Sequence, residues 1–252
     1  MRAFPTIIVL RADGVELDRH AGFDGDADKF IAMLKNWSEN KNTLYSYLEE
    51  WAQDTTDVEW NHRIAERYVD RFQTNLAQRF WHNVLKLDPQ NETGYVPVAE
   101  FNIALHQARS NGETEKLSML LETESDPDRL RAGFFILARV YESRNDVDKA
   151  VKTYQRALEK MPDDAGFMNA CAWFIYEQQA RDYYDLGIEL AQQAVKLSPE
   201  DAGIWDTLAW LLHSDGQYQQ AVDAMSKAVE LEPDVDYFIQ SLKRMKNDAM
   251  KS

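Results

Sequence analysis

Residues 221–233 read AVDAMSKAVELEP, and their order of small, bulky and helix-ending residues returns three more times earlier in the chain. The helix-ending prolines are Pro89, Pro162, Pro199 and Pro233. Twelve positions before them stand Ala77, Ala150, Gly187 and Ala221. Five positions before them stand Val84, Ala157, Ala194 and Ala228. Recurrence of one pattern along a chain indicates an internal structural repeat.

The recurring positions predict closely packed helices. A small residue near the start of a helix lets its backbone approach the preceding helix, and a bulky residue one turn later fills the groove between them. At that position the residues are usually larger: they are Trp81, Tyr154, Ala191 and Met225. Proline then ends the helix, because it lacks the N–H donor and clashes with the preceding turn.

A second helix is predicted before each of these. Apolar residues at i, i+1 and i+4 mark one helix face. They are Ile64, Ala65 and Tyr68; Leu137, Ala138 and Tyr141; Cys171, Ala172 and Ile175; Leu208, Ala209 and Leu212. With Gly216 as the turn of the last unit, the pattern predicts a series of helical hairpins.

These hairpins resemble the tetratricopeptide repeat (TPR) family, whose period is about 34 residues. The repeat units are expected at 58–91, 131–164, 165–201 and 202–235, with a short insertion near residues 180–184 in the third. Residues 92–130 have room for a degenerate hairpin, with helices near Val96–Arg109 and Glu113–Glu124 and Asp126-Pro127 as terminator. A capping helix is expected at 236–252, since solenoids must cover their last apolar face. The expected fold class is mainly α, a TPR-type superhelix of about five hairpins.

Residues 1–37 show a different pattern. Thr6-Ile7-Ile8-Val9-Leu10 predicts a strand buried on both faces, Asp13-Gly14 a turn, and residues 15–23 a partner strand. Asp26 or Asp28 can cap a helix that runs to Trp37. Its inward residues are expected to be Phe30, Ile31, Met33 and Leu34.

This ββα segment, with Phe4-Pro5-Thr6 before it, resembles the C-terminal part of the thioredoxin fold. The resemblance implies a cis-proline at Pro5. The half of that fold that carries two redox cysteines is absent, so this chain cannot run thiol–disulfide exchange by the family mechanism. An isolated hairpin leaves a sheet edge unpaired. Either the chain is a fragment, which we favour, or its strands dock elsewhere, with residues 38–57 as a linker that holds an amphipathic helix over Asn42–Asp54.

Charge and composition limit the classes of partner. The 252 residues carry a formal net charge of −15, which disfavours nucleic acid and anionic membranes as partners. Hydrophobic residues make up 44%, enough for a folded core. No apolar run reaches the length of a membrane span. A protein or peptide partner that is not acidic is expected, and a homo-oligomer is an open alternative. Cys171 is the one cysteine, which suits the cytoplasm, or the periplasm if a longer N-terminus exists.

No constellation for catalysis, metal or cofactor binding stands out, so we expect no enzyme and no cofactor. The histidines lack zinc-ligand spacing; they are His20, His62, His82, His106 and His213. Residues 24–28 alternate aspartate with Gly25 and Ala27, but an EF-hand would need glycine and glutamate where Lys29 and Lys35 stand. Helix capping explains that run better, and Cys171 is expected to be a buried, inert thiol.

The TPR resemblance implies a concave groove lined by the first helix of each hairpin. The residues expected there are His62, Glu66, Phe135, Arg139, Glu142, Asn169, Trp173, Tyr176, Asp206, Trp210 and His213. Aromatic residues with polar neighbours suit peptide anchoring. In the alternative interpretation, Trp173 and Trp210 pack between hairpins. The family's carboxylate clamp is not expected, because its lysines are missing and Glu66 is acidic.

Two functions follow as hypotheses. In the first, the chain is a non-catalytic scaffold that binds a protein or peptide in its groove. In the second, it is the client-binding part of a thioredoxin-family oxidoreductase whose CxxC-bearing half is absent from this chain. A structural subunit whose groove is filled by another copy is a third, weaker possibility.

Overall fold

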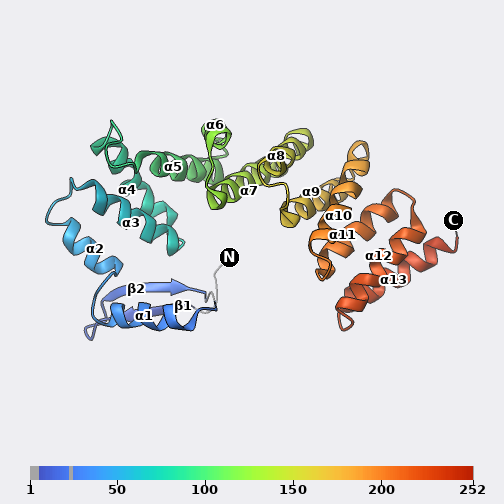
Figure 1. Cartoon of the computed structure of the whole chain (residues 1–252), viewed down its shortest axis with the longest axis horizontal. Helices are drawn as coiled ribbons and strands as arrows, with labels where there is room; N and C mark the ends of the chain where they lie inside the picture. The colour runs from blue at the N-terminus through green and yellow to red at the C-terminus, as the bar shows by residue number, and fades with distance from the viewer. Residues whose placement is uncertain (1–5, 23–24, 252) are drawn as a thin grey trace. The chain divides into compact units, whose positions relative to one another are not determined.

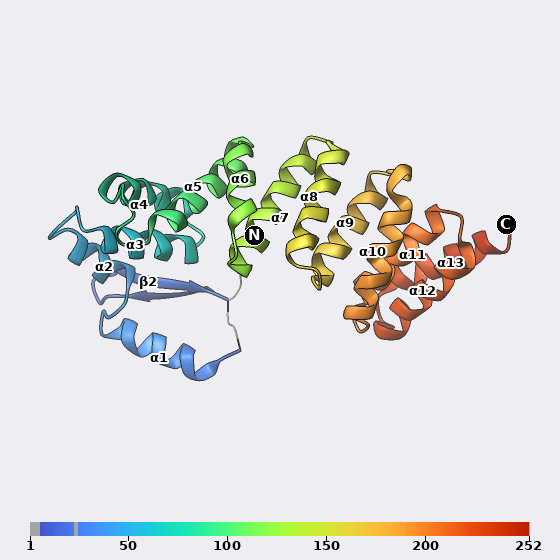
Figure 2. The same cartoon turned by 45° about the horizontal axis from the view of Figure 1, so that its top comes forward.

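The computed structural model describes residues 6–22 and 25–251. The chain forms two compact units, Met1–Leu117 (unit 1) and Ser118–Ser252 (unit 2), and each is described by itself. Figure 1 labels the elements, and Figure 2 shows them from a second side.

Most of the described residues are helical, which confirms the expected fold class. Unit 1 contains β1 (Thr6–Leu10), β2 (Glu16–Ala21), α1 (Ala27–Ser38), α2 (Leu44–Trp51), α3 (Val58–Asp70), α4 (Thr74–Leu87) and α5 (Val96–Asn111). Helix α6 (Glu115–Thr123) contains the unit boundary. Unit 2 continues with α7 (Pro127–Ser143), α8 (Val147–Lys160), α9 (Ala165–Glu177), the 3-10 helix η1 (Arg181–Tyr183), α10 (Tyr184–Leu197), α11 (Ala202–Ser214), α12 (Tyr218–Leu231) and α13 (Asp236–Ala249).

The small residues of the repeat lie where neighbouring helices meet. Helices pack in the pairs α3–α4, α7–α8, α9–α10 and α11–α12, as helical hairpins require. The small residues of α4, α8, α10 and α12 are buried throughout. At Gly187 a Cβ atom would lie 3.3 Å from side-chain atoms of both Ile175 and Leu211. A larger residue there would push α10 away from α9 and α11.

Local signals set the helix ends. Helices α4, α8, α10 and α12 each stop two residues before the proline of their unit. Aspartates cap several starts: the Asp57, Asp146 and Asp201 carboxylates accept hydrogen bonds from backbone N–H groups of α3, α8 and α11. Asp26 does the same for α1 by accepting from the Lys29 N–H at 3.0 Å. This confirms capping as the role of the acidic run around Asp26; Asp24 lies outside the described residues.

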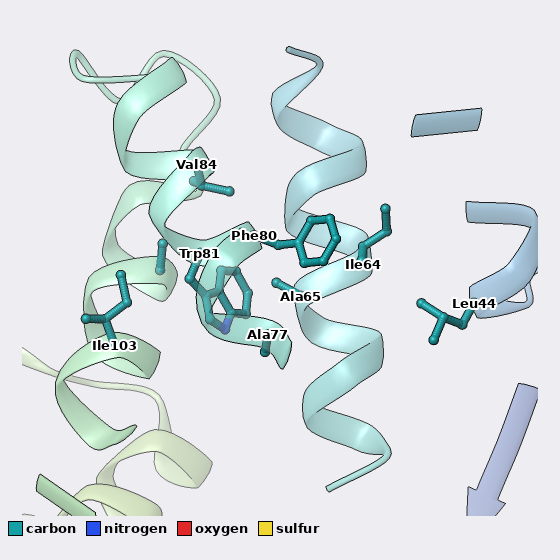
Figure 3. Close-up of a cluster of buried hydrophobic side chains, with 9 residues drawn as sticks. Leu44, Ile64, Ala65, Ala77, Phe80, Trp81, Val84 and Ile103 are labelled. Carbon is teal, nitrogen blue, oxygen red and sulfur yellow. The ribbon is translucent and has the colours of Figure 1, made fainter. Parts of the chain in front are cut away.

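The core of unit 1 joins the linker to the first hairpin. Figure 3 shows Trp81 and Phe80 of α4 among side chains from α2, α3 and α5. Trp81 is fully buried, although it is the largest residue type, because Ala65 and Ala77 beside it leave room for its ring. The buried members of the cluster are Leu44, Ile64, Ala65, Ala77, Phe80, Trp81, Val84, Ala99 and Ile103.

The N-terminal strands form an antiparallel hairpin, with Thr6 opposite Ala21 and a turn at Gly14 whose φ is +86°. The expectation that β1 is buried on both faces is wrong: Ile8 is 46% and Leu10 is 56% exposed. Helix α1 packs against β1, and β2 is its one strand neighbour among the described residues. Because no second layer covers them in this part of the chain, alternate residues of β1 face solvent.

The hairpin also docks on the helices. Strand β2 packs against α2, and its Asp18 is fully buried and bonded to α3. In the structure the strands thus dock on the helices of unit 1, which was the second of the two possibilities raised from the sequence. The cis-proline interpretation concerns Pro5, which lies outside the described residues.

Three further expectations are corrected. Ile31 is 63% exposed, because it lies on the outer side of α1 while Trp37 is buried. Helix α2 covers eight residues rather than the whole of Asn42–Asp54, since Thr43 caps its start. Asp126 and Pro127 begin α7 instead of ending the preceding helix: the Asp126 carboxylate accepts from the Arg129 N–H, and proline suits the first helical position.

None of the helices in the described ranges is both long and apolar enough to cross a lipid bilayer.

A candidate polypeptide-binding face on unit 2

Nine of the residues expected in the groove lie on three consecutive first helices of unit 2, α7, α9 and α11. They form three rows with one residue from each helix. The first row is Phe135, Asn169 and Asp206; the second is Arg139, Trp173 and Trp210; the third is Glu142, Tyr176 and His213. We call the side of α7, α9 and α11 that carries these rows the groove face.

An apolar hollow of about 440 Å³ lies between α7 and α9, at the start of the first row. Its wall includes Phe135, which is 49% exposed. Small residues, Gly166 and Ala170, leave the space open on the α9 side. The full lining is Asp128, Arg131, Ala132, Phe135, Gly166, Phe167 and Ala170. At the rim, Arg131 is already paired, since its guanidinium lies 2.6 Å from the Asp164 carboxylate.

Two side-chain oxygens further along the first row have no donor. Asn169 Oδ1 and Asp206 Oδ1 are buried and lack a hydrogen-bond partner among the described residues. Asp206 as a whole is only 7% exposed. Burial raises the pKa of this carboxyl to about 6, while the neighbouring donor groups of Trp210 and Tyr237 act in the opposite direction. An orphaned acceptor of this kind is uncommon in proteins and costs free energy.

In the second row, the residue on α11, Trp210, is covered by neighbouring side chains. Trp210 is 7% exposed, its Nε1–H donates to the Tyr237 hydroxyl at 2.9 Å, and the Arg244 guanidinium lies 5.2 Å from its ring. Trp173 is half-buried beside Tyr176, with ring centroids 5.2 Å apart. Trp210 of α11 therefore packs against Tyr237 and Arg244 of α13, the helix after the last hairpin.

The third row consists of paired polar groups. Glu142 accepts from the Tyr154 hydroxyl at 2.6 Å and from Arg139 at 2.9 Å. The His213 Nε2 atom lies 3.1 Å from an Asp248 carboxylate oxygen. A polar hollow of about 340 Å³ lies beside Tyr176 and His213; its lining is Tyr176, Glu177, Gln179, Arg181, Tyr184, Trp210, His213, Ser214 and Arg244.

The other two expected residues lie on α3 in unit 1. The His62 ring stacks on Tyr95 with centroids 4.0 Å apart, and its Nε2 lies 3.3 Å from Glu66. Burial lowers the pKa of His62 and raises the pKa of Glu66, so each favours its neutral form. These two residues form a local pair within their own unit.

Helix α13 supplies residues that sequence analysis treated only as a cap. Tyr237, Arg244 and Asp248 contact Trp210 or His213 on the groove face. The repeat period could have identified one of them from the sequence, because Arg244 stands one period of about 34 residues after Trp210. The sequence did not identify Gly166 and Ala170 as site residues, because their contribution is the small size of their side chains, which leaves the hollow open.

Cys171 is fully buried, and burial raises the pKa of its thiol to about 12. A protonated, enclosed thiol is a poor nucleophile and metal ligand. Within the described ranges, no group of three or more His, Cys, Asp or Glu side chains could hold a metal ion.

The model of one protein family, ChAPs (Chs5p-Arf1p-binding proteins), matches residues 103–237. That range is more than half of the chain's 252 residues. No curated protein matches the chain.

Solved structures show the TPR fold. YrrB, described as a TPR protein with an unusual peptide-binding site, is 15% identical with a TM-score of 0.58, over 78% of this chain and 97% of its own. MamA from Desulfovibrio magneticus RS-1 is 18% identical with a TM-score of 0.55, over 71% of this chain and 97% of its own. Another MamA structure is 17% identical with a TM-score of 0.54, over 70% and 92%. At these identities the likeness concerns the fold.

Proposed function

This chain belongs to the ChAPs family, and we propose that it is a non-catalytic scaffold that binds an extended polypeptide on the groove face of unit 2. The observation that carries the proposal is the apolar hollow between α7 and α9, where Phe135 stands half-exposed. Apolar hollows with a few polar groups around them are typical of ligand sites. Short peptide segments bind helical grooves through side-chain anchors in such hollows.

The relatives support a binding role. The family description names proteins that bind Chs5p and Arf1p, which are polypeptides. YrrB, of similar fold, is described as having a peptide-binding site. Fold similarity supports polypeptide binding only by association, so the site itself has to be tested.

The proposed partner is a neutral or basic protein or peptide, because the chain has a formal net charge of −15. The same charge disfavours nucleic acid and anionic lipid surfaces. We propose the cytoplasm as the compartment, on the grounds of a single cysteine that is buried.

Selection from a displayed library of random peptides tests this function. The full chain serves as bait, beside a variant in which Ala170→Leu fills the hollow. We expect peptides that bind the natural chain and lose binding to the variant. Enrichment no better than on bare support, or equal enrichment on both baits, would remove the groove face as the binding site.

A second candidate comes from the N-terminal hairpin: the chain would be the client-binding part of a thioredoxin-family oxidoreductase. The supporting observation is β1, whose outer edge has no strand beside it within the described residues and whose Ile8 and Leu10 are half-exposed. Further strands of a larger sheet would cover such an edge.

The coding DNA around this chain tests the second candidate. An in-frame upstream segment that encodes a CxxC motif, followed by reduction of insulin disulfides by the longer protein, would support it. A longer reading frame without a cysteine pair, or no activity from it, would contradict it.

A further inference from the structure

We propose that the groove face recognises an extended peptide in which a bulky apolar side chain is followed, three or four residues later, by lysine or arginine. The inference rests on the proposed function and specifies its ligand. It is built on the first row of the groove face, Phe135, Asn169 and Asp206, which changes from apolar to polar to acidic across α7, α9 and α11.

The apolar end of the row accepts the bulky side chain. The hollow of about 440 Å³ has space for a leucine or phenylalanine side chain, and Phe135 offers its half-exposed ring as a contact surface. The wall of the hollow is mainly apolar; of the charged residues on its rim, Arg131 is paired with Asp164 and Asp128 is exposed to solvent. An apolar ligand side chain should therefore gain more binding free energy in this hollow than a polar one, because its affinity comes mainly from burial of apolar surface.

At the acidic end of the row, one carboxylate oxygen of Asp206 lacks a donor. Asp206 Oδ1 is buried with no hydrogen-bond partner, and no lysine or arginine within the described residues reaches ion-pair distance of its carboxylate. Two arginines of unit 2 have other partners: Arg139 on α7 is engaged with Glu142, and Arg244 on α13 lies against the Trp210 ring. A ligand cation would satisfy this carboxylate, and Asn169 Oδ1 before it could accept a backbone N–H.

The contact that now holds Asp206 is weak enough to be replaced. The Tyr237 hydroxyl lies 3.5 Å from Asp206 Oδ2, at the outer limit of a hydrogen bond, and Tyr237 is 48% exposed. The ammonium or guanidinium group of the ligand takes the place of this hydroxyl at Asp206, while the hydrogen bond that the Tyr237 hydroxyl accepts from Trp210 Nε1–H at 2.9 Å does not involve Asp206. The net charge of −15 adds a general attraction for a basic segment.

The spacing follows from helix packing. Neighbouring helix axes lie about 8–10 Å apart, and an extended chain advances about 3.3 Å per residue. The hollow lies between α7 and α9, and Asp206 lies on the next helix, α11. The two ligand side chains are therefore about three or four residues apart.

The experiment repeats the displayed-library selection with four full-length baits: the natural chain, Asp206→Asn, Ala170→Leu and the control Asp185→Asn. Asp185 is exposed on α10, which is not one of the three groove-face helices, and its substitution makes the same charge change. We expect the natural chain and the control to enrich an apolar residue followed by lysine or arginine. Asp206→Asn should keep the apolar preference and lose the basic one, while Ala170→Leu should lose the apolar preference. Circular dichroism verifies that each bait is folded.

Fluorescence anisotropy then measures an enriched peptide and its lysine-to-glutamate version. The natural chain should bind the lysine version about tenfold more tightly, and Asp206→Asn should bind the two about equally. Peptides that bind through the groove face without this pattern, or a basic preference that survives Asp206→Asn, would overturn the inference and leave the proposed function in place. Selection of no peptide by any bait would overturn both.

Discussion

The Asp18 carboxylate of β2 lies 2.7 Å from the Arg67 Nε atom of α3, and both belong to unit 1. Asp18 is completely buried, and it also accepts from Arg71 at 3.0 Å and from the Leu44 N–H at 2.8 Å. Arg67 stacks on Trp37 of α1, with its guanidinium carbon 4.9 Å from the ring centroid. One carboxylate and one guanidinium thus connect the N-terminal hairpin, α1, α2 and the first helical hairpin.

Removal of this carboxylate should destabilise unit 1. Asp18→Ala removes the buried carboxylate that Arg67 and Arg71 share, although Arg71 keeps Glu16 and Arg67 keeps Asp70 as ion-pair partners. Loss of one side of a buried ion pair costs about 3–5 kcal/mol, and the remaining partners place the expected loss at the lower end of that range. Urea denaturation followed by circular dichroism measures the loss. Asp13→Ala removes an exposed carboxylate paired with Arg11 and should leave the curve unchanged. Equal curves for both variants would show that the buried network contributes nothing to stability.

The small residues of the repeat should resist enlargement. Ala150 and Ala221 are fully buried where helices meet, so Ala150→Leu and Ala221→Leu should each cost about 1–3 kcal/mol through overpacking. Differential scanning calorimetry should show a lower Tm for each. Lys152→Leu adds a leucine at an exposed position of α8 and serves as the control. An unchanged Tm for both alanine variants would refute the close packing on which the repeat assignment depends.

Phe72 occupies a strained backbone position in the turn between α3 and α4. Its φ is +57°, and it is 67% exposed. The corresponding turns of later hairpins use Asn145, Gln179 and Gly216 with φ between +49° and +83°. Left-handed backbone costs a bulky residue about 1–2 kcal/mol, and asparagine tolerates it better.

Phe72→Asn should therefore stabilise the chain by about 1 kcal/mol in urea denaturation. Gly216→Ala is the opposite change at an open position, and it should destabilise by a similar amount. If Phe72→Asn were instead the less stable protein, the exposed ring would have to make a stabilising contact that outweighs the strain.

Asp206 should make stability depend on pH. Its folded pKa of about 6 lies above the ordinary value of 3.8, so the folded state binds the proton more tightly than the unfolded state. The stabilisation from protonation is complete below about pH 4 and is lost as the pH rises through 6. Asp206→Asn removes this loss and should stabilise the chain by about 2 kcal/mol at pH 7.5 and by almost nothing at pH 4.

Denaturation curves of the two proteins at both pH values measure this difference. The Asp185→Asn control should show no such dependence. A gain from Asp206→Asn that is the same at pH 4 and pH 7.5 would mean that the burial of the charge is not its cause.

The groove face shows where prediction from sequence ends. The rows of α7, α9 and α11 follow from the repeat period, and the hollow beside Phe135 lies between two of those helices, α7 and α9. The repeat period did not reveal which of the groove positions stay exposed to solvent. Trp210 and Phe135 are both aromatic residues at groove positions, yet one is 7% and the other 49% exposed. The difference comes from Tyr237 and Arg244 of α13, which cover Trp210.

The N-terminal segment shows the same limit. The apolar run of β1 and the Gly14 turn predicted a hairpin, because strand propensity and turn chemistry are local properties. Whether its faces are covered depends on other layers, and the prediction of a doubly buried strand was wrong for Ile8 and Leu10. The salt bridge of Asp18 to Arg67 joins residues 49 positions apart, a separation that no local pattern encodes.

The sequence by itself determined the four hairpins of the repeat, the ends of their second helices and their close-packed seams, because prolines and small residues act within a turn or two of where they stand. Only the tertiary structure decided which groove positions are buried, which acceptors lack a donor and how the N-terminal hairpin is held. These properties depend on side chains that come from distant parts of the chain and meet only after folding.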